Sequence, residues 1–259
     1  MKITDPSMRI GGITDMSTVD WYGNVSLVMF FAGCNLRCPY CQNSSLIPMD
    51  SGEEVKLDYL RERLEIAMKP VPQLDAAVFT GGEPSLQPDA AIEAAKLVHS
   101  YGLKIMLDTN GTHFGNVKRM LETGLFQRVA LDVKAPLSAA AYGKVTGTGK
   151  MGNRIARNVW KTLELCKSLG VEVEARTTVV PGLSDGDEFI QMIAEKIKDH
   201  VDVYYLQQFS NMGDILDPKL KETSPTTKEK LLALARIAVD AGVEKVYIKT
   251  RYEGLERVT

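Results

Sequence analysis

Three of the chain's four cysteines lie within eight residues, in the sequence Cys34-Asn-Leu-Arg-Cys38-Pro-Tyr-Cys41. Thiolates at this spacing can bind three irons of one [4Fe-4S] cluster, which leaves the fourth iron open to another ligand. An open iron indicates chemistry and not only electron storage. The alternatives are a structural zinc site and a chance group of buried thiols. A zinc site usually takes its fourth ligand from a nearby Cys or His, but the nearest histidine is His99.

A second candidate for chemistry is the segment Thr80-Gly81-Gly82-Glu83-Pro84. Its two glycines allow positive φ and a close approach of the backbone to a ligand, and Glu83 offers a carboxylate to an ammonium group. Alone, the segment is better explained as an ordinary strand-to-helix turn. Because it follows the next predicted strand after the cysteines, we expect it to belong to the same site.

Short runs rich in β-branched residues alternate with longer amphipathic segments along the chain. The predicted strands are 25–31, 76–79, 104–107, 128–132, 171–180, 202–206 and 245–249. Apolar residues at helical spacing predict helices around 57–68, 159–166, 190–197 and 231–237. This alternation predicts an α/β fold, with a parallel sheet and outer helices, open or closed into a partial (β/α)6 TIM-like barrel.

In such a sheet, function gathers just beyond the carboxyl ends of the strands, so each polar motif is expected there. The cysteines follow the first predicted strand, 80–84 the second and 108–111 the third, while 132–134 closes the fourth, Arg176 lies in the fifth and Gln207-Gln208 follows the sixth. We therefore expect these polar clusters to converge on one rim of the sheet.

The composition fits one large globular domain, because 259 residues are 44% hydrophobic and 25% charged. We expect a single domain over 1–259, with 1–24 as an N-terminal lead-in and 245–259 as a C-terminal strand and tail. The net charge of -2 and the pI near 6.0 give no general attraction to nucleic acid or to anionic membrane. The apolar run 25–32 is too short to span a bilayer, so we expect a cytoplasmic protein.

The cysteine triad, Tyr40 before its last member and the Gly81-Gly82-Glu83-Pro84 segment together resemble the radical S-adenosylmethionine (SAM) superfamily. The resemblance implies that Cys34, Cys38 and Cys41 hold a [4Fe-4S] cluster whose open iron chelates the amino and carboxylate groups of SAM. It also implies that segment 81–84 meets the methionine ammonium and that Tyr40 presents its backbone to the adenine.

Further motifs are similar to those of the activating enzymes of glycyl-radical enzymes. They are 107–111, 131–134 and 176–185, together with 19–26 before the cysteines and Asn43 after them. Within that group the sequence most resembles the longer anaerobic ribonucleoside-triphosphate reductase activating proteins. The resemblance implies reductive cleavage of SAM to a 5'-deoxyadenosyl radical, which abstracts hydrogen from a glycine of a partner glycyl-radical enzyme. It also implies an external one-electron donor, flavodoxin or ferredoxin.

The resemblance assigns two further sets of residues at the strand ends. The ligands of a monovalent cation are Asp108, Thr109 and Asp132, and the further cofactor contacts are Asn110, Lys134, Arg176 and Gln208. Alternatively, the two aspartates are turn or N-cap residues, or a general acid/base pair. Arg176 could also pair with Glu172 or Glu174, which we expect only if that strand face is solvated. Some activating enzymes carry a histidine near the strand end where this chain has Gln208.

The sequence departs from many activating enzymes because it has no room for a ferredoxin-like insert with further clusters. Cys166 is the only other thiol, and its helical spacing predicts a buried small hydrophobe. Segment 143–152 lacks Walker spacing and is predicted to be a flexible loop over the rim, where a partner could dock. Two other functions stay open: a radical SAM enzyme for a small molecule or nucleobase, such as 7-carboxy-7-deazaguanine synthase, and a cluster carrier without catalysis.

Overall fold

The computed structural model describes residues 6–69 and 73–259, so the first five residues of the predicted lead-in lie outside the described part. The chain forms two compact units. The first unit comprises Met1–Asn35, Ser45–Thr109 and Gly115–Val129, and the second comprises Leu36–Ser44, Asn110–Phe114 and Ala130–Thr259. No helix in the described part of the chain combines the length and the hydropathy needed to cross a membrane.

The first unit is built on strands in the spatial order β3 (Glu53–Val55), β1 (Met8–Ser17), β2 (Ser26–Phe31), β4 (Ala76–Gly81) and β5 (Lys104–Thr109). Strands β2, β4 and β5 are parallel, whereas β1 is antiparallel to both of its neighbours. The apolar β2 is buried along almost its whole length, as expected for a parallel strand covered on both faces.

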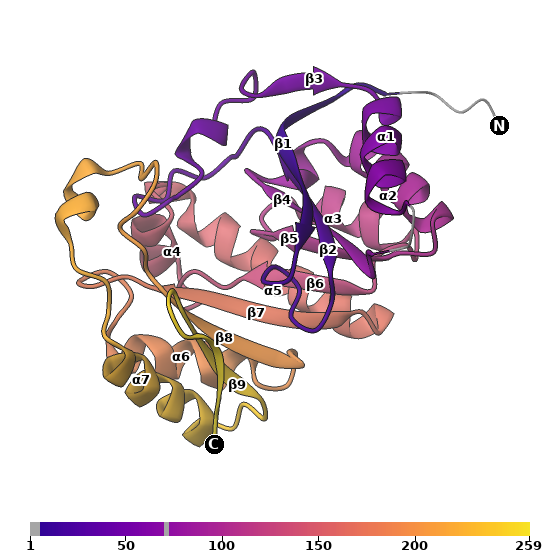
Figure 1. Cartoon of the computed structure of the whole chain (residues 1–259). Helices are drawn as coiled ribbons and strands as arrows, with labels where there is room; N and C mark the ends of the chain where they lie inside the picture. The colour runs from indigo at the N-terminus through magenta and orange to yellow at the C-terminus, as the bar shows by residue number, and fades with distance from the viewer. Residues whose placement is uncertain (1–5, 70–72) are drawn as a thin grey trace. The chain divides into compact units, whose positions relative to one another are not determined.

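Helices α1 (Leu57–Ala67) and α2 (Pro88–Ser100) of this unit pack against each other, and α1 also contacts β1 (Figure 1). The buried face of α1 is formed by Leu57, Leu60 and Leu64, which recur at helical spacing. Helix α3 (Phe114–Leu121) and the 3-10 helices η1 (Ser44–Leu46) and η2 (Pro84–Leu86) complete the elements before β6 (Arg128–Asp132).

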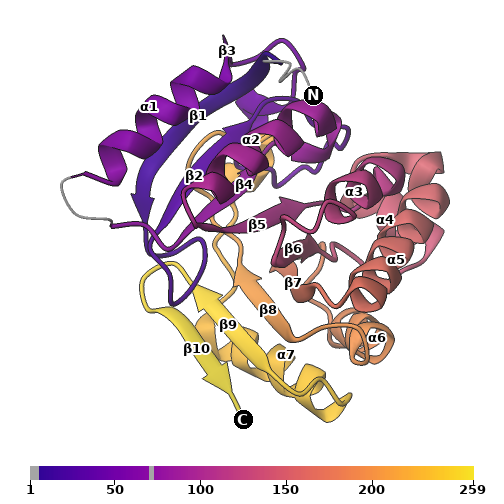
Figure 2. The same ribbon diagram turned by 90° about the vertical axis from the view of Figure 1, so that its right-hand side faces the viewer.

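The second unit is built on strands β7 (Glu172–Val179), β8 (Val203–Gln208) and β9 (Val246–Thr250), which are parallel, and on β10 (Gly254–Val258), which is antiparallel to β9. Its helices are α4 (Ala139–Val145), α5 (Gly152–Leu169), α6 (Asp187–Ile197) and α7 (Lys228–Asp240), with 3-10 helices η3 (Gly149–Met151) and η4 (Pro218–Glu222). Figure 2 shows α7 beside β9 and β10, with α6 as its neighbour.

The α/β class with mostly parallel strands and outer helices is confirmed, and all seven predicted strands and all four predicted helices are present. The sequence did not predict β1, β3 and β10, and of these β1 lies in the lead-in and β10 in the tail. The interior of β1 contains Gly11 and Gly12 beside a register irregularity, and β10 exposes Gly254, Glu256 and Arg257. Glycine and charge at such positions hide a strand from pattern analysis.

Segment 143–152 is not the flexible loop that the sequence predicted. It contains the end of α4, all of η3 and the start of α5. A Cβ at Gly143 would lie 2.2 Å from the carbonyl oxygen of Gly149, so the two backbones pack in direct contact. The glycines of this segment suggest a mobile loop in the sequence, but in the structure Gly143 permits close packing of the backbone.

Candidate active site

Cys38 and Cys41 share one turn of the second unit, because the Cys41 N–H donates to the Cys38 carbonyl oxygen at 3.0 Å. Burial raises the pKa of the Cys38 thiol to about 11 and also raises the pKa of Cys41, while the nearby Lys134 ammonium opposes both shifts. Both thiols therefore stay protonated at neutral pH until a metal displaces the protons. Two adjacent thiols in a largely buried turn are a chemically suitable part of an iron-sulfur site.

Cys34 belongs to the first unit, where its N–H donates to the Ile47 carbonyl oxygen at 3.0 Å and Gly33 donates to Leu46 at 2.8 Å. Gly33 has a φ of 89°, which favours glycine at this turn. Within residues 6–69 and 73–259, no three His, Cys, Asp or Glu side chains form a group that could hold a metal ion. The ligand set of three cysteines thus stays a prediction from the sequence.

The two glycines of segment 80–84 let the end of β4 approach the chain's own backbone. A Cβ at Gly81 would lie 2.5 Å from the backbone nitrogen and oxygen of Phe31, and a Cβ at Gly82 would lie 2.2 Å from the carbonyl oxygen of Gly33. Gly81 also has a φ of 110°. Any larger residue would push this segment away from β2 and from the turn before Cys34, so the glycines are required by packing alone.

Glu83 is a fully buried carboxylate at the start of η2, and Pro84 follows it as the first helical residue. Its Oε1 accepts hydrogen bonds from the Ser85 N–H at 3.0 Å and from the Thr109 hydroxyl at 2.7 Å. Two donors from different elements fix the orientation of the carboxylate. The pairing joins residues 26 positions apart, since Thr109 ends β5 and Glu83 lies just beyond the end of the neighbouring parallel strand β4, and no local sequence signal predicts it.

The residues predicted as cation ligands each have a partner within the protein. Asp108 accepts from the Thr80 hydroxyl at 2.7 Å in the first unit, while Asp132 binds the Lys134 ammonium at 2.6 Å in the second. Thr109 is the donor to Glu83 described above. Neither of the two aspartate bonds is a turn or N-cap contact, because Asp108 lies in β5 and Asp132 lies in β6. The cation site stays a prediction.

Lys134 is held beside the cysteine turn, with its Nζ 5.9 Å from the centre of the Tyr40 ring. Burial works against the charged form, but Asp132 and the neighbouring Tyr40 and Cys38 outweigh it, so the pKa of Lys134 lies well above its ordinary value. The lysine therefore carries a full positive charge and neutralises Asp132. A fixed cation at this position suits a carboxylate ligand or an anionic thiolate.

Arg176 pairs with Glu174, its Nε lying 2.5 Å from Oε1. The pair is buried, with 8% of Arg176 and 1% of Glu174 exposed. The expectation that such a pair forms only on a solvated face is wrong, because each charge here replaces the water around the other. A contact between Arg176 and the cofactor stays a prediction.

Asn110 and Gln208 make hydrogen bonds that stabilise turns. The Asn110 Oδ1 accepts from the N–H and the hydroxyl of Thr112 at 3.0 and 2.7 Å, as in an Asx turn. The Gln208 amide donates to the Thr226 carbonyl at 2.7 Å and accepts from the Arg251 N–H at 3.0 Å. Both side chains thus have structural roles, beside the cofactor contacts predicted for them.

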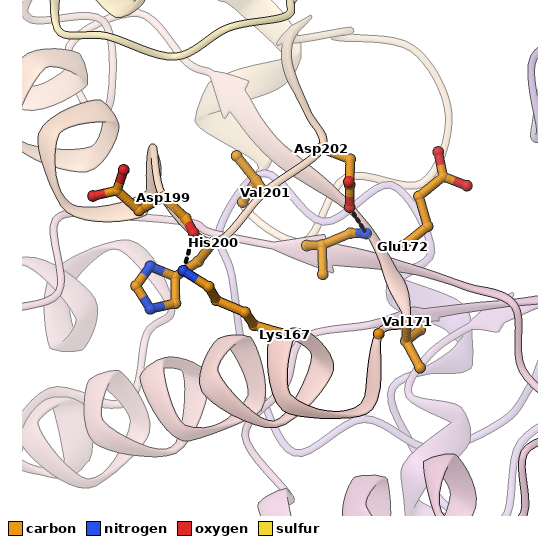
Figure 3. A pocket seen from close by; sticks show the side chains of 9 residues that line it. Lys167, Val171, Glu172, Asp199, His200, Val201 and Asp202 are labelled. Atoms are coloured by element: carbon orange, nitrogen blue, oxygen red, sulfur yellow. Dashed lines mark hydrogen bonds between the residues drawn. The ribbon is translucent and has the colours of Figure 1, made fainter.

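The second unit has a pocket of about 330 Å³ at the amino ends of β7 and β8, whereas the predicted site residues lie at or beyond the carboxyl ends of the strands (Figure 3). It is lined by the end of α5, the start of β7 and the segment before β8. Lys167 donates to the carbonyl oxygen of Asp199 at 2.7 Å and Asp202 accepts from the Val173 N–H at 2.7 Å. Since these polar groups bind the chain itself at the amino ends of β7 and β8, the pocket is no part of the predicted site.

The sequence model of the Radical SAM superfamily matches residues 28–195 of the chain, which include all three clustered cysteines and the glycine-rich segment after β4. The chain belongs to the radical SAM superfamily. Members use a [4Fe-4S] cluster and SAM, so these two predicted cofactors are confirmed.

Two relatives of this radical SAM enzyme match it over nearly their whole length. A Methanocaldococcus jannaschii protein, provisionally named a glycyl-radical enzyme activating enzyme, is 34% identical over 241 residues, covering 93% of this chain and 95% of the relative. The pyruvate formate-lyase-activating enzyme of Clostridium pasteurianum is 34% identical over 233 residues, covering 86% and 93%. The predicted membership of the activating-enzyme group is thereby confirmed.

The fold is also that of a solved radical SAM enzyme. The crystal structure of a radical SAM methyltransferase from Sphaerobacter thermophilus superposes with a TM-score of 0.67 at 14% identity, over 90% of this chain and 68% of the methyltransferase. At this identity the similarity concerns the fold alone.

Proposed function

We propose that this radical SAM enzyme activates a glycyl-radical enzyme by taking a hydrogen atom from one glycine of that partner. The observation that carries the proposal is the similarity to two activating enzymes over nearly their full length. The proposed electron donor is an external flavodoxin or ferredoxin, because the chain has one spare thiol and no second cysteine cluster.

The proposed cluster ligands are Cys34, Cys38 and Cys41. When bound, the [4Fe-4S] cluster supplies the electron that cleaves SAM into methionine and a 5'-deoxyadenosyl radical, and this radical abstracts the hydrogen atom. In this proposal Glu83 accepts a hydrogen bond from the methionine ammonium of SAM. The orientation of its carboxylate is already fixed by the hydrogen bonds from Ser85 and Thr109. Preorganised acceptors of this kind position SAM without a further ordering cost.

The other proposed roles belong to the strand ends. Lys134 and Arg176 offer positive charge to the carboxylate and hydrogen bonds to the ribose, and Tyr40 offers its backbone to the adenine. The remaining proposed contacts are Gly81, Gly82, Pro84, Asn110 and Gln208 to the cofactor, and Asp108, Thr109 and Asp132 to a monovalent cation. The charge of Lys134, held by Asp132, supports the first of these roles.

The proposed partner is an anaerobic ribonucleotide reductase, because within the activating-enzyme group the sequence most resembles the longer anaerobic ribonucleoside-triphosphate reductase activating proteins. To test this, the cluster is reconstituted without oxygen, and reductant and SAM are added with either an anaerobic ribonucleotide reductase or a pyruvate formate-lyase. A doublet signal in electron paramagnetic resonance is expected on the reductase.

The matched controls for this experiment are two cysteine variants. Cys38→Ala is expected to lose the cluster and the signal, whereas Cys166→Ala is expected to keep both, because Cys166 is buried in α5. If 5'-deoxyadenosine forms but no partner acquires a radical, activation is refuted and a small-molecule substrate is favoured. Retention of the cluster by Cys38→Ala would refute the ligand assignment.

A further inference from the structure

We propose that two segments far along the chain form a backbone clamp on the cysteine loop, Leu36–Ser44, and set the positions of Cys38 and Cys41 before any metal binds. The first jaw of the clamp is Thr146 and Gly147, and the second jaw is 214–217. The proposal rests on the proposed function only in taking these two cysteines as cluster ligands. The cysteine loop and both jaws lie in the second unit.

The first jaw holds the beginning of the cysteine loop. The Arg37 N–H donates to the Thr146 carbonyl oxygen at 3.0 Å. Gly147 has a φ of 66°, and a Cβ there would lie 2.2 Å from the Arg37 carbonyl oxygen, so the two backbones touch. Thr146 is itself fixed, because its N–H and hydroxyl both donate to the Tyr142 carbonyl oxygen in α4, at 3.0 and 2.5 Å.

The second jaw holds the rest of the loop. The Asp217 and Leu216 N–H groups donate to the carbonyl oxygens of Pro39 and Cys41 at 2.9 and 3.2 Å. Ser44 donates to the Asp214 carbonyl oxygen through its N–H at 3.4 Å and through its hydroxyl at 2.7 Å. Between these contacts the side chain of Ile215 is buried, which anchors the jaw in the unit.

These contacts bracket both cysteines. Apart from Ser44, the first residue of η1, the cysteine loop forms no helix or strand of its own. Its backbone would otherwise be ordered only when a metal binds, and the lost conformational entropy would weaken that binding. Hydrogen bonds at Arg37, Pro39, Cys41 and Ser44 meet that cost during folding. The second jaw lies beyond residues 28–195, which the superfamily model matches, so it is not part of the shared motif.

A matched pair of glycine variants tests the first jaw. Gly147 and Gly149 both have positive φ, at 66° and 52°, but a Cβ at Gly149 would meet no atom within 4 Å. Gly147→Ala therefore pushes the jaw off Arg37, while Gly149→Ala adds only backbone strain. In the metal-free protein, hydrogen–deuterium exchange at the Arg37 amide is expected to be about tenfold faster in Gly147→Ala than in Gly149→Ala.

A second matched pair of glycine variants tests the second jaw. Gly213 and Gly254 have φ of 85° and 74°, and neither would bring a Cβ within 4 Å of another atom. Gly213 precedes the jaw, whereas Gly254 lies at the start of β10. Gly213→Ala and the milder Ser44→Ala are expected to speed exchange of the Ser44 amide, and Gly254→Ala is not.

The effect of the clamp on metal binding is measured as the iron and sulfide that each chain retains after reconstitution and treatment with a chelator. Gly147→Ala and Ser44→Ala are expected to lose iron several-fold faster than Gly149→Ala. Equal exchange within both glycine pairs would overturn the clamp, and so would unchanged iron loss despite faster exchange, because the loop would then not position the ligands. If the unaltered protein binds no iron, the proposed function fails, and the exchange experiment alone decides whether the clamp exists.

Discussion

At the scale of single residues, Arg176 and Glu174 on β7 form a buried ion pair. Glu174→Ala would leave the guanidinium buried without this carboxylate, which costs about 3–5 kcal/mol of unfolding free energy. Glu172→Ala is the matched control, because Glu172 lies on the same strand but is exposed, and we expect a change of about 0.5 kcal/mol or less. Urea denaturation of both variants measures the difference, and equal losses would contradict the buried pair.

Cys166 gives stability a specific dependence on pH. Burial raises the pKa of its thiol from 9.0 to about 12. As pH rises, the thiol ionises in the unfolded chain before it does in the folded protein. The unfolding free energy is therefore unaffected by this thiol's ionisation below pH 9 and falls as pH rises from 9 toward 12. At pH 10 the loss of unfolding free energy is about 1 kcal/mol relative to pH 7.

Cys166→Ala should therefore lower the unfolding free energy at pH 7 but reduce its fall between pH 7 and pH 10 by about 1 kcal/mol. Urea denaturation of the metal-free protein at both pH values tests this. An unchanged difference between the two pH values would show that the thiol is solvated.

Spacing alone was enough to propose candidate residues for the chemistry, since three thiols and a Gly-Gly-Glu-Pro segment are short-range patterns. Partners were harder to predict. The bond from Thr109 to Glu83 depends on two strands pairing in register, and the burial of Arg176 depends on what covers β7. Both facts arise from tertiary packing, which a local pattern does not contain.

At the scale of elements, the parallel strands were predictable from short runs rich in apolar and β-branched residues, whereas the edge strands and helices α2, α3 and α4 were not. The buried face of α2 is made mostly of alanines, at positions 90, 91, 94 and 95, with Leu97 and Val98. It therefore lacks the regularly spaced leucines that predicted α1 and α7. Strand β10 is recognisable only beside β9, because a single buried side chain, Val258, marks its inner face.

Helix α7 offers a test at this scale. The side chain of Thr227 caps the helix by accepting from the Lys230 N–H at 3.3 Å. Thr227→Ala should lower the unfolding free energy by about 1 kcal/mol. Ser138 holds the same N-cap position before α4 but makes no side-chain cap bond. Ser138→Ala should therefore lower the unfolding free energy by only a few tenths of a kcal/mol. Thermal unfolding of both variants makes the comparison, and equal shifts would contradict the cap.

For the whole molecule, alternation of strands and helices was enough to predict the α/β class, and the motif positions at strand ends followed from it. The cysteine loop shows where such prediction stops. Its second jaw comes from residues about 170 positions later in the chain, as the bond from Ser44 to Asp214 shows, and no motif joins them. Such long-range backbone contacts appear only once the chain is folded.

Hydrogen transfer from a glycine of the partner is the central claim and can be measured directly. The candidate ribonucleotide reductase is produced with glycine deuterated at its α-carbon, mixed without oxygen with the reconstituted enzyme, SAM and reductant, and the 5'-deoxyadenosine is analysed by mass spectrometry. We expect deuterium to appear in the 5'-deoxyadenosine together with the radical on the partner. Unlabelled 5'-deoxyadenosine, formed at the same rate with and without the partner, would contradict the proposed function.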